Sequence, residues 1–366
     1  NVLVVTDRVL HESGVLDGIK QALEDHGTRF EIYDGVQPDP AFDQVQAGAE
    51  MLCASGAGAV VAVGGGSVMD AAKMVCLLHT NPGTLEDFAK PSLGRNPGLP
   101  LFAIPTTAGT GSEVTPVSVI TDPQTHQKTP VADGGMMPLY VALDAQIMSG
   151  MPEAITAATG MDALTHAVES FLSKASDEDT ERQAVAAVRL IFNNLPTAWA
   201  EGGNLAARDA MALAAFYAGS AFSRTSVGYV HAIAHQLGRV CNTPHGNANA
   251  MVLPEVLQAY GESIHPRLAE LARRAGVDAP GGSDTEVASH FIRAIIELRK
   301  RLDLPLLPRG LKKDDLPEII KEAVAEAGSL YPVPRYLSGA ELATIVTGLL
   351  PATQPNELEI HAHGLQ

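Results

Sequence analysis

The chain has 366 residues, more than one ordinary hydrophobic core holds, so two domains are expected. Its 42 acidic residues against 25 basic ones give a formal charge of -17, which argues against nucleic acid or an anionic membrane surface as a partner. Cys53, Cys76 and Cys241 show no paired spacing, which excludes a disulfide framework and favours a reducing, cytoplasmic location.

Short β-branched runs alternate with amphipathic segments over the first 150 residues. The chain opens inside an expected strand without an initiator methionine, so we expect a native segment before Asn1, and with it any targeting signal. No signal peptide or bilayer-spanning apolar run is recognisable. Strands are expected at residues 2–5, 30–33, 59–63 and 101–104, and this alternation predicts βαβ units with a mainly parallel sheet. The turn at Asp122-Pro123 predicts a hairpin over 118–131.

After Gly150 the sequence changes to long segments with helical periodicity, rich in alanine, leucine and glutamate. Helices are expected at residues 162–172, 180–199, 205–222, 227–237, 248–260, 284–302 and 316–326. This pattern predicts an α/β domain over 1–151 and an all-α domain over 152–366, with a ligand cleft between them. The closing residues 356–366 are expected to form a loosely held tail.

Gly64, Gly65, Gly66 and Ser67 follow an expected strand and precede a helical stretch. Glycines there let the backbone turn closely around a phosphate, and the exposed amides at a helix start attract its charge. The dinucleotide fingerprint is incomplete, because Met69 replaces its third glycine. Ser67 and Asp70 equally fit a capping box, so the structural alternative is a well-capped helix.

A second glycine-rich loop, 105–113, follows the expected strand 101–104 and contains Thr106, Thr107 and Thr110. Two such loops at the carboxyl ends of neighbouring strands predict a ligand site. Asp7, at the end of the first expected strand, could accept hydrogen bonds from a ribose diol and would repel a 2'-phosphate. It could equally cap the helical turn that follows it.

Asp162 and His166 are four residues apart in a helical stretch, so both side chains leave one helical face and can meet one ion. His231 and His235 repeat this spacing, and His245 follows after a short turn. A mixed nitrogen and oxygen set suits Fe(II), Zn or another first-row ion. By spacing alone, any of the three later histidines could bind it.

Several segments together resemble one family, the iron-dependent alcohol dehydrogenases, often called group III. The segments are 64–73 (GGGSVMDAAK), 104–115 (IPTTAGTGSEVT), 160–167 (GMDALTHA), 231–238 (HAIAHQLG), 242–249 (NTPHGNAN) and 331–336 (YPVPRY). The resemblance implies a dehydroquinate synthase-like, mainly parallel α/β nucleotide-binding domain and an all-α metal-binding domain. It assigns Asp162, His166, His231 and His245 to the metal, and places His235 beside the nicotinamide as the proton carrier. A zinc protease is excluded because Ala232 occupies the position of its general base.

The resemblance also implies NAD as the cofactor. It places Asp7 on the adenosine ribose and assigns the rest of the cofactor site to Asp39, Gly64, Gly65, Gly66, Ser67, Asp70, Thr106, Thr107, Thr110 and Lys128. Asp39 departs from the asparagine that is common in relatives; it either disfavours NADP further or caps the next helix. The substrate pocket falls on Val117, Phe222 and Ser329, although Phe222 is better explained as core packing.

The function implied is an NAD(H)-linked, metal-dependent alcohol dehydrogenase and aldehyde reductase, acting on short to medium primary alcohols or diols, and a homodimer. Maleylacetate reductases compete less well because they lack the full metal set. A sugar-phosphate cyclase of the dehydroquinate synthase type needs several basic residues for its substrate phosphate, and only Arg224 and Arg239 lie near 231–245. A non-catalytic NAD-binding or metal-storage protein is the alternative outside enzymology, disfavoured because such a site is costly to assemble without use.

Overall fold

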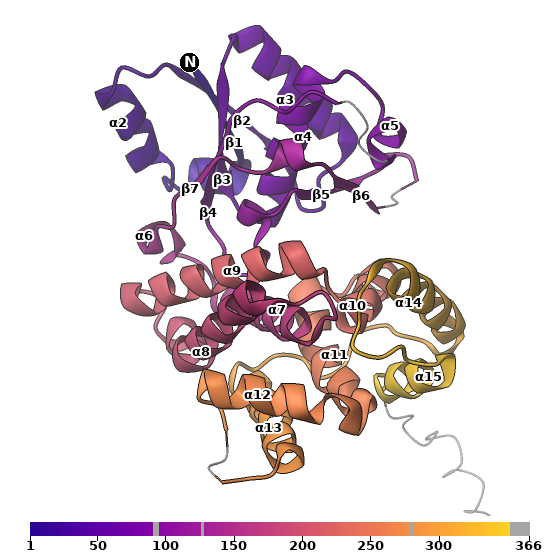
Figure 1. Cartoon of the computed structure of the whole chain (residues 1–366). Helices are drawn as coiled ribbons and strands as arrows, with labels where there is room; N and C mark the ends of the chain where they lie inside the picture. Colours follow the sequence, from indigo (N-terminus) through magenta and orange to yellow (C-terminus); the bar gives the residue numbers. More distant parts are fainter. Residues whose placement is uncertain (91–94, 126–127, 279–280, 352–366) are drawn as a thin grey trace, which may run out of the picture.

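The computed structural model describes residues 1–90, 95–125, 128–278 and 281–351. Its first half contains a five-stranded sheet of order β2-β1-β3-β4-β7 in which every neighbouring pair is parallel (Figure 1). The four expected strands are confirmed, each slightly longer than predicted: β1 (Val2–Asp7), β2 (Phe30–Val36), β3 (Ala59–Gly64) and β4 (Leu101–Pro105). The edge strand β7 (Tyr140–Val141) was not predicted, because two residues carry no periodicity.

Side chains alternate between the two faces of this sheet, as a parallel sheet covered on both sides requires. Leu3 and Val5 of β1 pack toward α3 (Phe42–Ser55) and α4 (Gly66–Thr80), whereas Val4 packs on the other face with Leu16. The remaining short helices are α1 (Arg8–Glu12), α2 (Asp17–Asp25), α5 (Leu85–Ala89) and α6 (Ala145–Met148). The predicted hairpin is confirmed as an antiparallel pair, β5 (Val117–Thr121) and β6 (Lys128–Ala132).

The second half is helical. Its elements are α7 (Glu153–Leu172), α8 (Glu178–Ala200), α9 (Leu205–Thr225), α10 (Tyr229–Cys241), α11 (His245–Tyr260), α12 (His265–Ala275), α13 (Asp284–Arg301), α14 (Leu316–Leu330) and α15 (Gly339–Gly348). All seven predicted helices are present, while α12 and α15 were missed. α7 begins at Glu153 rather than at the predicted residue 162. Its N-cap residue, Pro152, makes no side-chain cap hydrogen bond, so the sequence contains no capping signal for this start.

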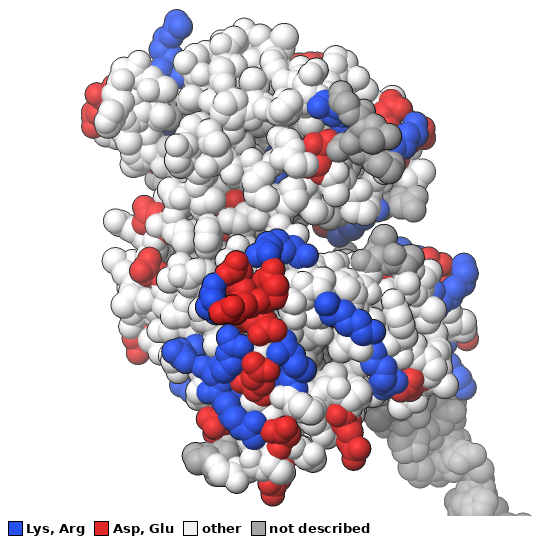
Figure 2. All heavy atoms as spheres, viewed as in Figure 1, with Lys and Arg blue, Asp and Glu red and all other residues white. Residues whose placement is uncertain are grey.

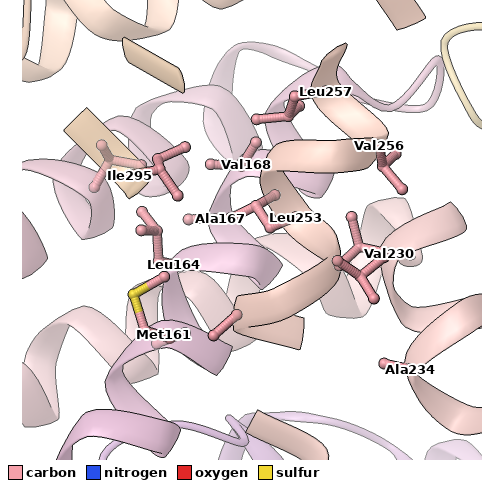
Figure 3. Packing of buried hydrophobic residues seen from close by; sticks show 14 of the residues in the cluster. Met161, Leu164, Ala167, Val168, Val230, Ala234, Leu253, Val256, Leu257 and Ile295 are labelled. Atoms are coloured by element: carbon pink, nitrogen blue, oxygen red, sulfur yellow. The ribbon is translucent and has the colours of Figure 1, made fainter. Parts of the chain in front are cut away.

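Helix α7 lies at the centre of the helical half, and all its side chains from Gly160 to Leu172 are buried. Its apolar residues interlock with those of α10, α11 and α13 (Figure 3), including Leu164, Val168, Leu253 and Ile295. A helix buried on every side is held in one orientation, so polar residues on α7 are placed precisely relative to the neighbouring helices.

The surface of the helical half carries a band of mixed charge (Figure 2). There Glu181 of α8 pairs with Arg267 and Arg274 of α12 at 2.5 and 3.2 Å, so the charges tie these two helices together. Among the described residues, no helix is both long enough and apolar enough to cross a membrane. Cys53, Cys76 and Cys241 are all free thiols, as predicted. The predicted tail, 356–366, lies outside the described residues.

Candidate active site

Four predicted metal donors converge on one point of the helical half. Asp162 and His166 extend from α7, His231 from α10, and His245 is the first residue of α11. The Nε2 atoms of His245, His231 and His166 lie 3.4, 3.8 and 4.0 Å from Oδ1 of Asp162. Donor atoms of Asp162, His166 and His231 lie within 4.8 Å of one another and could hold one ion. His245 stands outside that group, and its Nε2 approaches it only at the Asp162 carboxylate.

Burial and charge prepare the donors for a cation. Burial lowers the pKa of His166 to about 3, so its imidazole is neutral and keeps a free lone pair. Burial alone would lower the pKa of His231 too, but hydrogen bonds with Asp162 and Glu169 raise it to about 9. Although burial opposes it, the surrounding histidines hold the pKa of Asp162 well below its usual range. His245 is 41% exposed, so the donor set opens to solvent on that side.

Glu169 supports the donor set and was not predicted. Its carboxylate accepts hydrogen bonds from the backbone N–H groups of Gly228 and Val230 at 2.9 and 2.8 Å, and from Nδ1 of His231 at 2.6 Å. Because Nδ1 is held by Glu169, Nε2 is the ring nitrogen that faces Asp162, and an ion that binds there would displace the Nε2 proton. One signal could have found this residue: Glu169 lies seven positions after Asp162, on the same face of α7.

His235 lies beside the donor set but has a different partner. Its Nδ1 is 2.7 Å from Oε1 of Glu326, an oxygen that also accepts the Tyr331 hydroxyl at 2.5 Å. The ring stacks on His245 with centroids 5.4 Å apart and remains 42% exposed. Desolvation by its surroundings lowers the pKa of His235, although Glu326 counteracts this. The geometry therefore gives His235 an oriented ring with one nitrogen facing away from Glu326.

The two glycine-rich loops contact each other at the end of the sheet. A Cβ on Gly64 would lie 2.5 Å from Cβ of Val68, one on Gly65 would lie 3.2 Å from Thr107, and one on Gly66 would lie 2.9 Å from Thr110. Glycine is therefore needed for this close approach. Gly65 is the N-cap of α4, whose first amides face the loop junction. The capping-box alternative for Ser67 and Asp70 is wrong, because α4 has no side-chain cap.

Asp70 and Lys73 tie the second loop to α4. Asp70 accepts hydrogen bonds from the Ser112 hydroxyl at 2.6 Å and from the backbone N–H of Val119 at 2.9 Å. Lys73, which is fully buried, donates to Ser112 at 2.7 Å and to the carbonyl of Val117 at 2.7 Å. Burial raises the pKa of Asp70 and lowers the pKa of Lys73 to about 8.

The remaining predicted cofactor residues lie at the first two strands and at the hairpin. Asp7 caps α1, because its Oδ1 accepts the N–H of Leu10 at 2.9 Å. Asp39 adopts a φ of +54° and its carboxylate lies 2.6 Å from Nζ of Lys128, so the structure brings these two residues together. Asp39 does not cap the next helix, because the N-cap of α3 is Ala41.

The three predicted pocket residues differ in position. Phe222 stacks on His166 with centroids 4.1 Å apart and an interplanar angle of 15°, so it packs directly against one of the predicted metal donors. Val117 begins β5, next to the loop held by Lys73. Ser329 falls in the last turn of α14, and its side chain lies outside what the structure describes.

The second loop crosses from the sheet to the helical half. A Cβ on Gly109 would lie 2.5 Å from Cβ of Thr159 in α7, and one on Gly111 would lie 2.5 Å from Cα of Gly219 in α9. Gly111 has a φ of +63°, which favours glycine for a second reason. The loop that follows β4 therefore contacts the first glycine-rich turn as well as α7 and α9, and α7 carries two of the metal donors.

The α/β half carries two glycine-rich loops of the kind that binds phosphate, and the helical half brings together one carboxylate and three histidines that could hold a metal ion. These features are typical of a nucleotide- and metal-dependent enzyme. The family described as iron-containing alcohol dehydrogenase matches residues 1–145, and the C-terminal part of the Fe-containing alcohol dehydrogenase family matches residues 156–349. The chain belongs to the iron-containing alcohol dehydrogenase family.

Individual relatives agree with this assignment. The chain is 38% identical to the 1,3-propanediol dehydrogenase of Klebsiella pneumoniae over 94% of this chain and 89% of that protein. It is 35% identical to the NAD-dependent methanol dehydrogenase of Bacillus methanolicus, over 95% and 92%. A solved structure of 1,3-propanediol oxidoreductase superposes with a TM-score of 0.91 at 37% identity, covering 95% and 92%. The protein is therefore an oxidoreductase that interconverts alcohols and aldehydes.

Proposed function

We propose that this protein is an NAD(H)-linked dehydrogenase of short to medium primary alcohols or diols that depends on Fe(II) or a similar divalent ion. The observation that carries the proposal is the position of three imidazole nitrogens: Nε2 of His166, His231 and His245 lies 3.4 to 4.0 Å from Oδ1 of Asp162. The NAD dependence printed for the methanol dehydrogenase relative supports the cofactor.

Asp162, His166, His231 and His245 would hold the ion, which when bound would supply Lewis-acid polarisation of an alcohol oxygen, and the glycine-rich loops would hold NAD, which would supply the hydride acceptor. The helix start at Gly65 and Gly66 binds the pyrophosphate through backbone amides, with Thr106, Thr107 and Thr110 along the cofactor. Asp7 holds the adenosine ribose, and its charge repels the 2'-phosphate of NADP. Asp39 adds negative charge at the same end, next to Lys128.

His235 moves the hydroxyl proton. Its Nδ1 proton is engaged by Glu326, so Nε2 is the acceptor. The Glu326 carboxylate stabilises the imidazolium that forms, and the 42% exposure of His235 gives the proton a path to water. Phe222 of α9 and Val117 of β5 would bound the substrate, and Ser329 stays a predicted pocket residue.

The test is an alcohol and aldehyde panel run with NAD and NADP on stripped and Fe(II)-loaded protein. The proposal predicts NAD-dependent turnover of a primary alcohol or diol that chelation abolishes and Fe(II) restores. Full activity after chelation would contradict the metal-dependent mechanism, as a maleylacetate reductase-like enzyme would behave. A preference for NADP would contradict the roles of Asp7 and Asp39.

We further propose two domains, residues 1–151 and 152–366, in a cytoplasmic homodimer. The separate family matches to 1–145 and 156–349 support the boundary, and resemblance to the family supports the dimer. Light scattering of the purified protein at several concentrations tests the oligomeric state; a monomer at all concentrations would contradict it.

A further inference from the structure

Asn249 reaches into the donor set without belonging to it. It lies on α11, one helical turn after His245, and its side chain is fully buried. Its Nδ2 lies 2.7 Å from Oδ1 of Asp162, 3.2 Å from Nε2 of His231 and 3.2 Å from Nε2 of His245. Its Oδ1 has no hydrogen-bond partner among the described residues. The amide nitrogen of Asn249 therefore lies within hydrogen-bonding distance of three of the four predicted donor atoms.

The three contacts of the Asn249 amide nitrogen differ in strength. An amide nitrogen carries two hydrogens, so it cannot donate fully to three acceptors. The contact with the Asp162 carboxylate is the shortest and is charge-assisted, which makes it the strongest. Because Nδ1 of His231 is held by Glu169, Nε2 is the nitrogen that would bind an ion, and the Asn249 amide would then lose this contact. The bond to Asp162 is therefore the one that persists when the histidine lone pairs are used.

The position of Asn249 links two helices of the site. His245 and Asn249 are four residues apart on α11, so they lie on one face, and Asp162 lies on α7 opposite them. A hydrogen bond from Asn249 to Asp162 thus fixes the carboxylate from α7 relative to the imidazole from α11. A neutral donor is needed here, because a second carboxylate would repel Asp162 and an apolar side chain would leave its oxygen unpaired.

We propose that Asn249 is a positioning residue of the metal centre, which orients the Asp162 carboxylate and couples it to His245. This inference rests on the metal site of the proposed function. Ligand partners of this kind commonly contribute 10- to 100-fold in metal affinity. The same contribution is expected from Asn249, together with a defined coordination geometry around the ion.

The test uses Co(II) as the probe, added to the stripped full-length protein, with affinity measured by chelator competition and geometry by visible absorption. N249A is expected to bind Co(II) about 10- to 100-fold more weakly and with an altered d–d spectrum. N247A is the matched control: Asn247 lies on the same helix and also carries a buried, unpartnered Oδ1. Its affinity and spectrum are expected to match those of the wild type.

A double-mutant cycle separates positioning from general damage to the fold. In a D162N background, removing Asn249 is expected to change Co(II) affinity much less than in the wild type, because the partner of the hydrogen bond is altered. Wild-type affinity in N249A, or an equal fold-loss in both backgrounds, would overturn the inference. If N249A does not fold, N249S, too short to reach Asp162, replaces it with the same expected loss. Wild-type protein that binds no Co(II) would instead overturn the metal site itself.

Discussion

Nδ1 of His231 donates to the carboxylate of Glu169 across 2.6 Å, and both side chains are buried. The same carboxylate receives the backbone N–H groups of Gly228 and Val230, at the start of α10. Three donors thus meet one carboxylate, which fixes both the ring orientation of His231 and the entry of its helix. This arrangement decides which nitrogen of His231 faces the other metal donors: Nδ1 is held by Glu169, so Nε2 is the candidate ligand atom.

Replacing Glu169 by glutamine is expected to weaken metal binding. A glutamine that keeps its oxygen on Gly228 and His231 must turn its NH2 group against the N–H of Val230, so one hydrogen bond at the start of α10 is lost. The bond to His231 also loses its charge and holds the ring less firmly. We expect E169Q to bind a divalent ion about 10- to 100-fold more weakly, measured by chelator competition. E297Q, which changes an exposed glutamate paired with Lys300, is the control and should bind as the wild type does. Unchanged affinity in E169Q would show that the fold alone orients His231.

Replacing His235 should lower kcat without removing the metal, whereas loss of a metal ligand should remove the metal. Because Nδ1 of His235 is held by Glu326, we expect H235A to keep its metal while kcat falls by about 10²- to 10⁴-fold, the usual contribution of a positioned acid or base. Metal content measured by atomic absorption and kcat measured on the same samples make the comparison. Loss of the metal in H235A would instead place His235 in the ligand set. H26A, at an exposed histidine on the surface of the α/β half, is the control.

The sequence predicts the strands and the metal donors because both leave local patterns. Runs such as 59–63 are short and apolar, and Asp162 and His166 show their helical spacing directly. Glu169 and Asn249 are marked only by helical spacing, seven residues after Asp162 and four after His245, because α7 and α11 are buried on most sides and offer no polar face on which a functional residue would stand out. Their roles depend on partners far away in the sequence: Glu169 and His231 are 62 residues apart, and Asn249 and Asp162 are 87 residues apart.

Distant partners also explain why two helix-cap interpretations, at Asp70 and Asp39 in the predicted cofactor site, were wrong. Asp70 fits a capping box by spacing, yet its carboxylate bonds with Ser112, 42 residues on, because the second loop folds over α4. Asp39 fits a helix cap, yet it pairs with Lys128, 89 residues away. In both cases a tertiary partner outcompetes the local bond, and sequence spacing cannot reveal that partner.

Neutralising Asp7 should relax the preference for NAD. The asparagine of the D7N variant would still cap α1, because its side-chain oxygen can accept the N–H of Leu10, so the fold is retained. Removing the negative charge removes repulsion of a 2'-phosphate, and about 1.4 kcal/mol of relief corresponds to tenfold. We expect the ratio of kcat/KM for NADP to that for NAD to rise about tenfold or more in D7N. D25N, at an exposed aspartate, should leave the ratio unchanged; an unchanged ratio in D7N would remove Asp7 from the ribose site.

The contact between Gly111 and Gly219 is expected to hold the second loop against α9. A Cβ on Gly219 would lie 2.7 Å from Cα of Gly111 and 2.7 Å from Val114, so the loop must move away. We expect G219A to lose about 1–3 kcal/mol of unfolding free energy and to raise KM for NAD, since the loop also lines the cofactor site. G203A is the control, because nothing lies within 4 Å of its Cβ. Equal stability and KM in G219A and G203A would show that the loop tolerates displacement.

Glu113 should give the protein a pH-dependent stability that glutamine removes. Glu113 is buried, and burial raises its pKa to about 7 from an ordinary value of 4.5, with Lys73 opposing the shift. Between pH 4.5 and 7 the folded protein therefore binds more protons at this site than the unfolded chain. The contribution to unfolding free energy falls as pH rises through this window, by up to about 1.4 kcal/mol per pH unit.

Glutamine at position 113 carries no titrating proton, so E113Q is expected to lose this slope. Urea unfolding at several pH values between 4.5 and 8 measures it, and the difference between wild type and variant isolates Glu113 from the other carboxylates. E297Q serves again as the control, since the Glu297 side chain is exposed. A variant whose stability still falls as steeply as that of the wild type would show that Glu113 is already ionised in the folded protein. Lys73 would then be neutralised by two buried carboxylates, Asp70 and Glu113, rather than mainly by Asp70.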